Sequence, residues 1–278
     1  MVSCGCMWLA HGVLLSVLLV GFLPVAVPVT AELKPNTLAA FDRYADQREG
    51  QIRNELRDTS KFLWVDRLSE AERTKAYADM RAGRIVIDKG KRVNIPEGLI
   101  HHWTGAGFIP GATLQQMLGF IQDYNHHSTH YRPDVMASKL IAHNGNNFKI
   151  NLRFLKQKVV TVVLDTDHDV TFTNIDARHA ASLAHTTRVS EIENAGKPNE
   201  RALPPGGGWG FLWKMDTYWR FAEQDGGTYV QCETISLTRD IPFGLGWAVG
   251  RFVNSVPQES LTFTLTRTRE RLLATIKH

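Results

Sequence analysis

The chain has 278 residues, of which 43% are hydrophobic and 22% charged, and its formal net charge is +4. This length is sufficient for one large domain or two small ones with a sizeable core. The charge is mild and the sequence contains no long basic run, so the composition gives no support for nucleic-acid binding.

The first 31 residues contain no Asp, Glu, Lys or Arg, and the stretch from Val13 to Val29 is almost wholly apolar. Val29-Thr30-Ala31 has the small residues of a cleavage site. We therefore expect residues 1–31 to be a signal peptide that exports the protein to the periplasm or beyond. An uncleaved anchor is the alternative, although Pro24 and Pro28 interrupt the run before the ~20 residues of a spanning helix.

Of the three cysteines, only Cys232 would remain after cleavage. The mature chain would then have no internal disulfide, and its fold must depend on core packing. We expect Cys232 to be a small buried hydrophobe in a strand.

Two helices are predicted near the N-terminus, from Thr37 to Leu56 and from Glu70 to Met80. Ser69 and Glu72 have the spacing of a capping box, in which each side chain satisfies a free backbone donor. We assign residues 32–83 to an N-terminal helical extension and residues 84–278 to the main domain.

The main domain begins with two predicted strands around Lys89-Gly90, followed by a break at Pro110-Gly111. A helix is expected from Ala112 to about Ser128. Its apolar residues recur at helical spacing and predict one buried stripe, formed by Leu114, Met117, Leu118, Ile121 and Tyr124.

From Met136 the hydrophobic period changes to two, which indicates antiparallel strands with one buried face. Asn144-Gly145 predicts a hairpin turn before a strand whose buried side carries Phe148, Ile150, Leu152 and Phe154. The segments "KVVTVVLD", "HDVTFTNID" and "ASLAHTTRVSEIE" follow as strands. About fifteen residues rich in Pro and Gly then form a loop after Asn194, and such long loops are often functional or mobile.

The segment Trp213–Arg239 predicts a hairpin with one strongly aromatic face. A two-residue turn at Asp225-Gly226 sets its register. The facing pairs would be Phe221 with Val230, Trp219 with Cys232, Thr217 with Thr234, and Met215 with Ser236. The other face would carry a solvated charge network of Asp216, Arg220, Glu233 and Arg239. Only an inverted register would make these residues line the cavity, where they would become acid-base candidates.

A last helix is predicted to begin at the capping pattern Ser255-Val256-Pro257-Gln258 and to run to the C-terminus. Its buried stripe would have to pack against the sheet. The stripe consists of Leu261, Leu265, Thr268, Leu272 and Ile276.

The pieces "HHWTGAGFIPGATLQQML", "NLRFLKQKVVTVVL", "GFLWKMDTYWRFAEQDGGTYVQCETISLTRDIP" and "VPQESLTFTLTRTRERL" resemble exported bacterial members of the START-like superfamily. The resemblance implies an α+β helix-grip fold, with a curved antiparallel sheet wrapped on a long C-terminal helix. It also implies a hydrophobic cavity between sheet and helix that binds lipids, sterols or polyketides, while a minority of members are enzymes. The extension at 32–83 departs from this pattern and would either cover the cavity mouth or brace the sheet.

The function predicted from this resemblance is non-catalytic binding of an apolar small molecule or lipid, for transport or sensing. Access would be gated by the 194–208 loop or by the N-terminal helices. Ordinary core packing demands the same residue types, so it stays open as an alternative. The predicted lining consists of Trp103, Trp209, Phe211, Trp213, Met215, Trp219, Phe221, Leu261 and Leu265.

Two other functions remain as alternatives: a cyclase- or dehydratase-like enzyme in the same cavity, and an envelope domain with a filled core that binds another protein. Peripheral membrane contact also stays open. We predict no catalytic residue, cofactor or metal. His126 and His130 have helical metal-ligand spacing but lack a glutamate between them, and His101-His102 would point to opposite faces of a strand.

Overall fold

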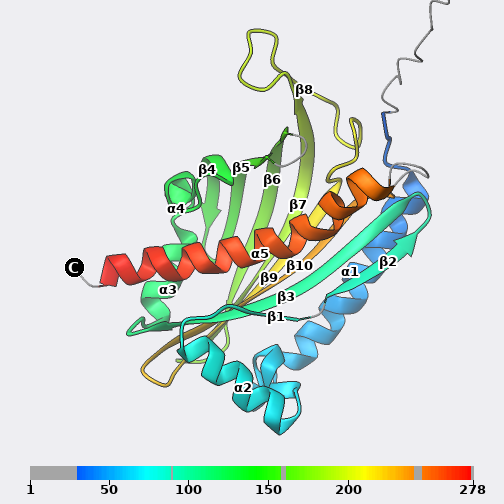
Figure 1. Cartoon of the computed structure of the whole chain (residues 1–278). Helices are drawn as coiled ribbons and strands as arrows, with labels where there is room; N and C mark the ends of the chain where they lie inside the picture. The colour runs from blue at the N-terminus through cyan, green and yellow to red at the C-terminus, as the bar shows by residue number, and fades with distance from the viewer. Residues whose placement is uncertain (1–29, 89, 158–160, 241–245, 277–278) are drawn as a thin grey trace, which may run out of the picture.

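The structure is a computed structural model that describes residues 30–88, 90–157, 161–240 and 246–276, with side chains in the last range described from Ser255 onward. Residues 1–29 of the predicted signal peptide lie outside this part of the chain. A ten-stranded antiparallel sheet forms the centre, helix α5 crosses one of its faces, and α1 and α2 lie against the other (Figure 1). This is the α+β helix-grip fold that the sequence predicted.

The helices are α1 Pro35–Glu55, α2 Glu70–Arg81, α3 Leu114–Gln122, α4 His127–His130 and α5 Gly246–Ile276, with short 3-10 turns η1 Thr59–Lys61, η2 Trp64–Arg67 and η3 Tyr124–His126. The strands are β1 Val86–Ile87, β2 Lys91–Ile95, β3 Gly98–Pro110, β4 Val135–Asn144, β5 Asn147–Gln157, β6 Thr161–Asn174, β7 His179–Glu193, β8 Arg201–Ala202, β9 Lys214–Gln224 and β10 Gly227–Arg239. Their order in the sheet is β1-β3-β10-β9-β7-β6-β5-β4, with β2 paired to β3 and β8 to β7.

The hairpin of β9 and β10 has the predicted register. All four predicted pairs are present, from Phe221 opposite Val230 to Met215 opposite Ser236. Asp225 and Gly226 both adopt positive φ angles, 56° and 71°, as the mirror-image turn of a two-residue hairpin requires. The register follows from a local turn and a local alternation, which is why the sequence could predict it.

The face under α5, called here the α5 face, holds the largest hydrophobic cluster. Phe221 and Cys232 pack there with the predicted stripe of α5, in which Leu261 and Leu265 are fully buried. Gly105 on β3 lets the helix approach closely, because a Cβ at this position would lie 2.8 Å from Leu265 and 2.5 Å from Ile87. Burial of Cys232 confirms its predicted role as a small core residue.

The N-terminal extension braces the opposite face of the sheet, called here the α1 face. Phe41 and Ile52 of α1 pack against Ile100 of β3 and Ile235 of β10. The extension therefore does not cover the space under α5, and a gate formed by these helices was a wrong expectation. The second alternative, a brace for the sheet, is the observed one.

Coverage by α1 also overturns the predicted solvated charge network. Asp216, Arg220 and Glu233 are only 3%, 1% and 0% exposed. They lie on the α1 face, as the register predicted, but the helix above them excludes water. The prediction was wrong because hairpin alternation assigns a side chain to a face and says nothing about what packs on that face.

Two other predicted elements differ in their bounds. The helix expected to reach Ser128 ends at Gln122, because Asp123 leaves the helical conformation with ψ 58° and the chain continues in the 3-10 turn η3, where the His126 N–H donates to the Asp123 carbonyl at 3.0 Å. Three strands occur where two were predicted, because the chain turns back at Pro96-Glu97. Lys89 of the predicted turn lies outside the described residues.

Three smaller differences concern one turn, one strand and one helix start. The first hairpin turns at Gly145-Asn146, one residue later than predicted. The segments expected as two strands after residue 160 form the single strand β6. Helix α5 begins at Gly246 and continues through Pro257, although the sequence predicted that the helix would start at the Ser255–Gln258 cap. Proline removes one backbone hydrogen-bond donor, and the packing of the buried stripe of α5 maintains the helix there. Among the described helices, none is long and apolar enough to cross a membrane.

Candidate functional site

The centre of the α5 face is partly exposed to solvent. Trp103, Thr234, Thr217 and Ala184 are neighbours in register across β3, β10, β9 and β7, and we call them the central row. All four are partly exposed, although they lie in the middle of a wide sheet beneath a helix. The side chains above this row therefore leave it accessible, which is the property expected of a ligand-binding surface.

Most of the predicted lining residues lie on the α5 face. Met215 and Trp219 are partly exposed beside the central row, and the rings of Trp219 and Phe221 are stacked with centroids 6.0 Å apart. Leu261 and Leu265 close the space from the side of the helix.

Three predicted lining residues lie away from the central row. Trp213 is buried on the α1 face with Phe41 and Ile235, because β9 begins only at Lys214 and the alternation does not extend back to residue 213. Trp209 is 36% exposed in the preceding loop. Phe211 packs against a small separate cluster on β6 and β7.

Two neutral histidines on the α5 face were not predicted as site residues. His168 of β6 is 4% exposed, and its Nε2 atom lies 2.8 Å from the Thr166 hydroxyl, which itself donates to the Leu152 carbonyl. Nε2 therefore carries the proton and Nδ1 is an acceptor. Burial lowers the pKa of His168 to about 4, so the ring is neutral. The alternation through Thr166 and Val170 would have placed His168 on this face.

His101 of β3 has the same character. It is fully buried, and its Nε2 atom lies 3.2 Å from the hydroxyl of Thr238, which donates to a backbone carbonyl. Burial lowers the pKa of His101 to about 4, and its Nδ1 atom has no hydrogen-bond partner among the described residues. The α5 face thus combines apolar rings with uncharged hydrogen-bonding groups.

The long loop before β9 is tied to the sheet near its end. Glu191, 5% exposed, accepts hydrogen bonds from the backbone N–H groups of Trp209 at 2.7 Å and Phe211 at 2.9 Å. Burial raises the pKa of Glu191. The N–H of Leu33 also donates to the Gly206 carbonyl at 2.7 Å. Gating by this loop stays a prediction.

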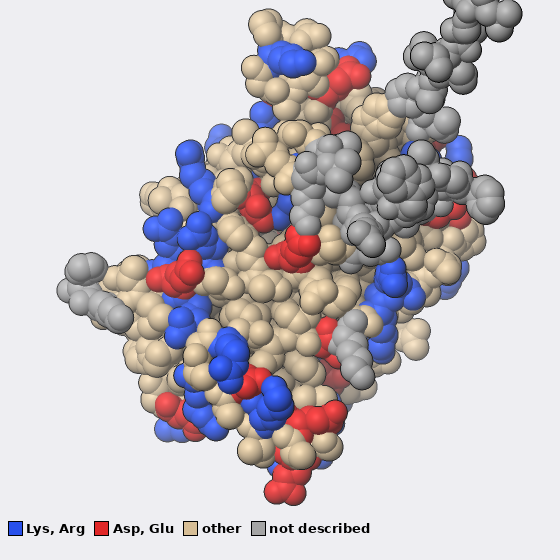
Figure 2. Space-filling view, in the orientation of Figure 1, with Lys and Arg blue, Asp and Glu red and all other residues tan. Residues whose placement is uncertain are grey.

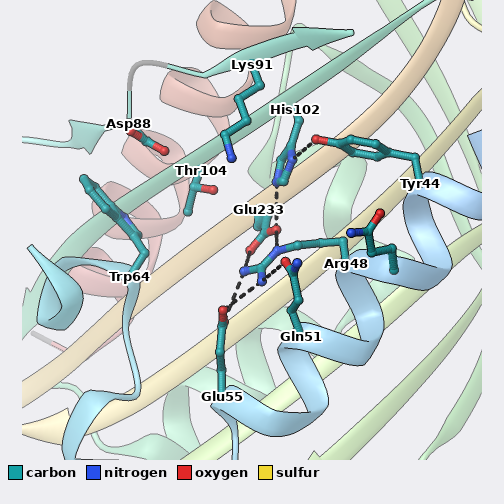
Figure 3. Close-up of a pocket in the computed structure, with 11 residues that line it drawn as sticks. Tyr44, Arg48, Gln51, Glu55, Trp64, Asp88, Lys91, His102, Thr104 and Glu233 are labelled. Carbon is teal, nitrogen blue, oxygen red and sulfur yellow. Dashed lines mark hydrogen bonds and ion pairs between the residues drawn. The ribbon is translucent and has the colours of Figure 1, made fainter. Parts of the chain in front are cut away.

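A second candidate site lies on the α1 face, where the extension meets the sheet. It is a pocket of ≈ 410 Å³ between α1, η2, the β1–β2 connection and the strands β3 and β10 (Figure 3). Its lining is mainly polar, and no sequence pattern pointed to it. The lining residues are Tyr44, Gln47, Arg48, Gln51, Glu55, Trp64, Asp88, Lys91, His102, Thr104 and Glu233.

Glu233 is the centre of a buried ion network in this pocket. Its carboxylate accepts hydrogen bonds from Arg48 at 2.5 and 3.0 Å and from His102 at 2.8 Å. Burial alone would raise the pKa of Glu233, but the bonds from His102 and Arg48 lower it to about 2. Arg48 also bonds Glu55 at 2.8 and 3.1 Å, and Tyr44 bonds the other nitrogen of His102 at 2.8 Å.

Three groups with metal-ligand chemistry meet beside this network. Candidate ligand atoms of Glu49, His185 and Asp216 lie within 4.8 Å of one another. However, His185 directs Nδ1 toward Asp216 at 3.2 Å and Nε2 toward Glu49 at 3.4 Å. A single ion could use only one of these nitrogens, so the arrangement is better explained as an imidazolium between two carboxylates. The bond to Asp216 raises the pKa of His185, in agreement with that explanation.

Charges on the face that carries α5 are mixed in sign. Figure 2 shows basic and acidic side chains interspersed over this side. His126 and His130, whose spacing was considered for a metal and not predicted as a site, both lie against Asp123, at 2.7 and 3.6 Å.

No protein-family model matches the sequence, and no curated protein does. Solved structures are similar at low identity. A STAR-related lipid transfer protein of Xanthomonas axonopodis is 16% identical with a TM-score of 0.42, covering 66% of this chain and 99% of its own. A protein of Thermus thermophilus is 15% identical with a TM-score of 0.44, covering 63% and 98%. The ZhuI aromatase/cyclase of a Streptomyces species is 11% identical with a TM-score of 0.41, covering 62% and 93%.

Identities and TM-scores at this level carry no argument about ligand or reaction. The fold is START-like on the arrangement of its own elements: a curved antiparallel sheet, a C-terminal helix packed along one face, and the helices α3 and α4 between β3 and β4.

Proposed function

We propose that this protein binds an apolar small molecule or lipid, without catalysis, between the α5 face of the sheet and helix α5. The observation that supports the proposal is the partly exposed central row, with Trp103, Thr217 and Thr234 beneath the helix. A ligand that covers this row and the neighbouring Trp219 removes apolar surface from water, at about 25 cal/mol per Å².

Polar groups of the same face favour a ligand with an uncharged polar end. The unprotonated Nδ1 atoms of His168 and His101 can accept a hydrogen bond from an alcohol, and the hydroxyls of Thr217 and Thr234 can exchange hydrogen bonds with an alcohol or a carbonyl. A charged head group buried against neutral histidines would lack a counter-charge, which is costly in a dry site. The proposal therefore favours an apolar body with a neutral hydroxyl or carbonyl group.

Native mass spectrometry of protein purified from its own host tests the binding. We expect a co-purifying apolar molecule, and we expect its loss in Ala184→Phe, which fills the space above the central row. Ala137→Phe, at an exposed position on β4, is the matched control. An unliganded wild type, or full ligand occupancy in Ala184→Phe, would refute the proposal.

A second candidate function, catalysis of the cyclase or dehydratase kind, has one observation in its favour. His168 is a neutral imidazole on the α5 face with an unprotonated Nδ1 atom, as a general base requires. Under this alternative His168→Gln would abolish turnover of a polyketide-like substrate while the same molecule still binds. Under the binding proposal the variant changes affinity alone.

Export to the periplasm or beyond is part of the proposal and is supported by the pattern of the first 31 residues. N-terminal sequencing of the protein recovered outside the cytoplasm would identify the cleavage site. Recovery of the full-length chain would support an uncleaved anchor in its place.

A further inference from the structure

The polar pocket on the α1 face is separate from the proposed ligand site, because the sheet lies between them. It exists only because the N-terminal extension packs on β3 and β10: Tyr44 and Arg48 come from α1, Trp64 from η2, and His102 from the sheet. Its volume of ≈ 410 Å³ falls within the range of small-molecule sites.

The Glu233 and Glu55 carboxylates of this pocket are already engaged by donors of the protein. Glu233 accepts three hydrogen bonds from Arg48 and His102, and Glu55 accepts from Arg48 and, at 2.5 Å, from Arg220. The two carboxylates and two arginines balance in charge. Since Glu233 is ionised, His102 donates to it through Nε2, and the other ring nitrogen, Nδ1, shares a hydrogen bond with the Tyr44 hydroxyl.

The unused groups of the pocket are hydrogen-bond donors. The ammonium of Lys91 makes no hydrogen bond or ion pair with any described residue, and Figure 3 shows it pointing into the pocket near Thr104. The indole Nε1 of Trp64 is buried without a partner in the same part of the structure, and so is the amide Nε2 of Gln231, whose oxygen accepts from the Trp64 backbone. Buried donors without partners require an explanation, such as a ligand or water.

We propose that this pocket binds a small organic anion with a flat ring, a compound of the aromatic carboxylate class. The carboxylate pairs with Lys91 and accepts from the Trp64 indole N–H and the Thr104 hydroxyl. The ring lies between Trp64 and Tyr44, which Figure 3 shows on opposite sides of the pocket. Asp88 is an exposed residue of the pocket lining, and its negative charge disfavours binding of the anion.

Benzoate is the probe, with benzamide as its uncharged analogue and inorganic phosphate as an anion without a ring. The readout is the NMR signal of the Trp64 indole N–H in the ¹⁵N-labelled full chain, assigned by its loss in Trp64→Phe. We expect benzoate to shift this signal in a saturable way. Benzamide lacks the charge and phosphate lacks the ring, so each should bind at least about tenfold more weakly than benzoate.

Variants separate the pocket from general charge effects. Lys91→Met should weaken benzoate binding by about tenfold or more, whereas Lys139→Met, at an exposed position on β4, should leave it unchanged. Asp88→Asn should strengthen binding by removing the opposing charge. Ala184→Phe should have no effect, because the central row lies on the other face, so failure of this proposal is distinguishable from failure of the lipid proposal.

Four results would overturn the inference. Equal binding of benzoate and benzamide would show that the anion is not recognised, and equal binding of phosphate would show that the ring is not. Absence of any Trp64 shift with benzoate would show that the pocket holds only water. Unchanged binding in Lys91→Met would show that Lys91 does not recognise the anion.

Discussion

Arg48→Met tests whether the buried ion network stabilises the fold. Arg48 carries two hydrogen bonds to a carboxylate, Glu233, whose side chain is 1% exposed. The variant keeps the length of the aliphatic stem and removes the charge. It leaves Glu233 buried with His102 as its remaining hydrogen-bond partner.

The magnitude follows from the pKa of Glu233. A depression from 4.5 to about 2 corresponds to about 3 kcal/mol of native-state stability, at 1.36 kcal/mol per pKa unit. Because the folded pKa is the lower one, this contribution is fully present above pH 4.5 and is lost as the pH falls toward 2. Part of this depression comes from the His102 bond, which the variant keeps, so the cost of losing Arg48 is taken from buried pairs that lose one partner. On that basis we expect Arg48→Met to lower the free energy of unfolding by about 3 kcal/mol at pH 7.

Urea unfolding of wild type and variant at several pH values measures this. The difference in the free energy of unfolding between wild type and Arg48→Met should become smaller as the pH falls below 4.5. Arg53→Met is the matched control on the same helix, because Arg53 is 68% exposed and lies 3.8 Å from Glu49; its effect should be near zero. A loss below about 1 kcal/mol at pH 7, or a loss that does not depend on pH, would refute the reasoning.

Three further predictions concern the α5 face. Leu265→Ala should lower the free energy of unfolding by about 2–5 kcal/mol in urea melts, because Leu265 is fully buried between α5 and the sheet. Gly105→Val should destabilise by about 1–3 kcal/mol and lower the melting temperature, since a Cβ there meets Leu265 and Ile87; unchanged melting would mean that the helix does not lie where we describe it. Burial lowers the pKa of His168 from 6.5 to about 4, so the unfolded state binds its proton first and stability falls as the pH drops from 6.5 toward 4. His168→Gln should therefore lose less stability than the wild type between pH 6.5 and 4. An unaltered pH profile of the free energy of unfolding would contradict this prediction.

Local patterns in the sequence predicted a large part of this fold. The turn at Asp225-Gly226 and the alternation of β9 specify the hairpin register, and the capping box at Ser69 specifies the start of α2. Each of these depends on residues a few positions apart. The sequence also predicted the buried apolar stripe of α5, although the helix begins earlier than the predicted cap at Ser255.

The pocket on the α1 face could not be predicted in this way. Arg48 and Glu233 are separated by 185 positions, and nothing in either segment indicates that the other lies beside it. Hairpin alternation correctly placed Glu233 opposite the aromatic face, yet its burial depends on where α1 docks. That docking is decided by packing of Phe41 and Ile52 against distant strands, which is a property of the whole chain.

The contact between α1 and β10 also has a consequence for the order of folding. The first helix of the described chain depends on β10, the last strand, so its final packing must wait until nearly all of the sheet has been synthesised and paired. Contacts so distant in sequence are slow to form, because the entropy of closing the intervening chain is lost before they contribute. Until then the segment from Pro35 to Glu55 would have to remain unpaired or find other partners. We expect its amides to gain protection from hydrogen exchange later than those of the β9–β10 hairpin, which closes through a two-residue turn.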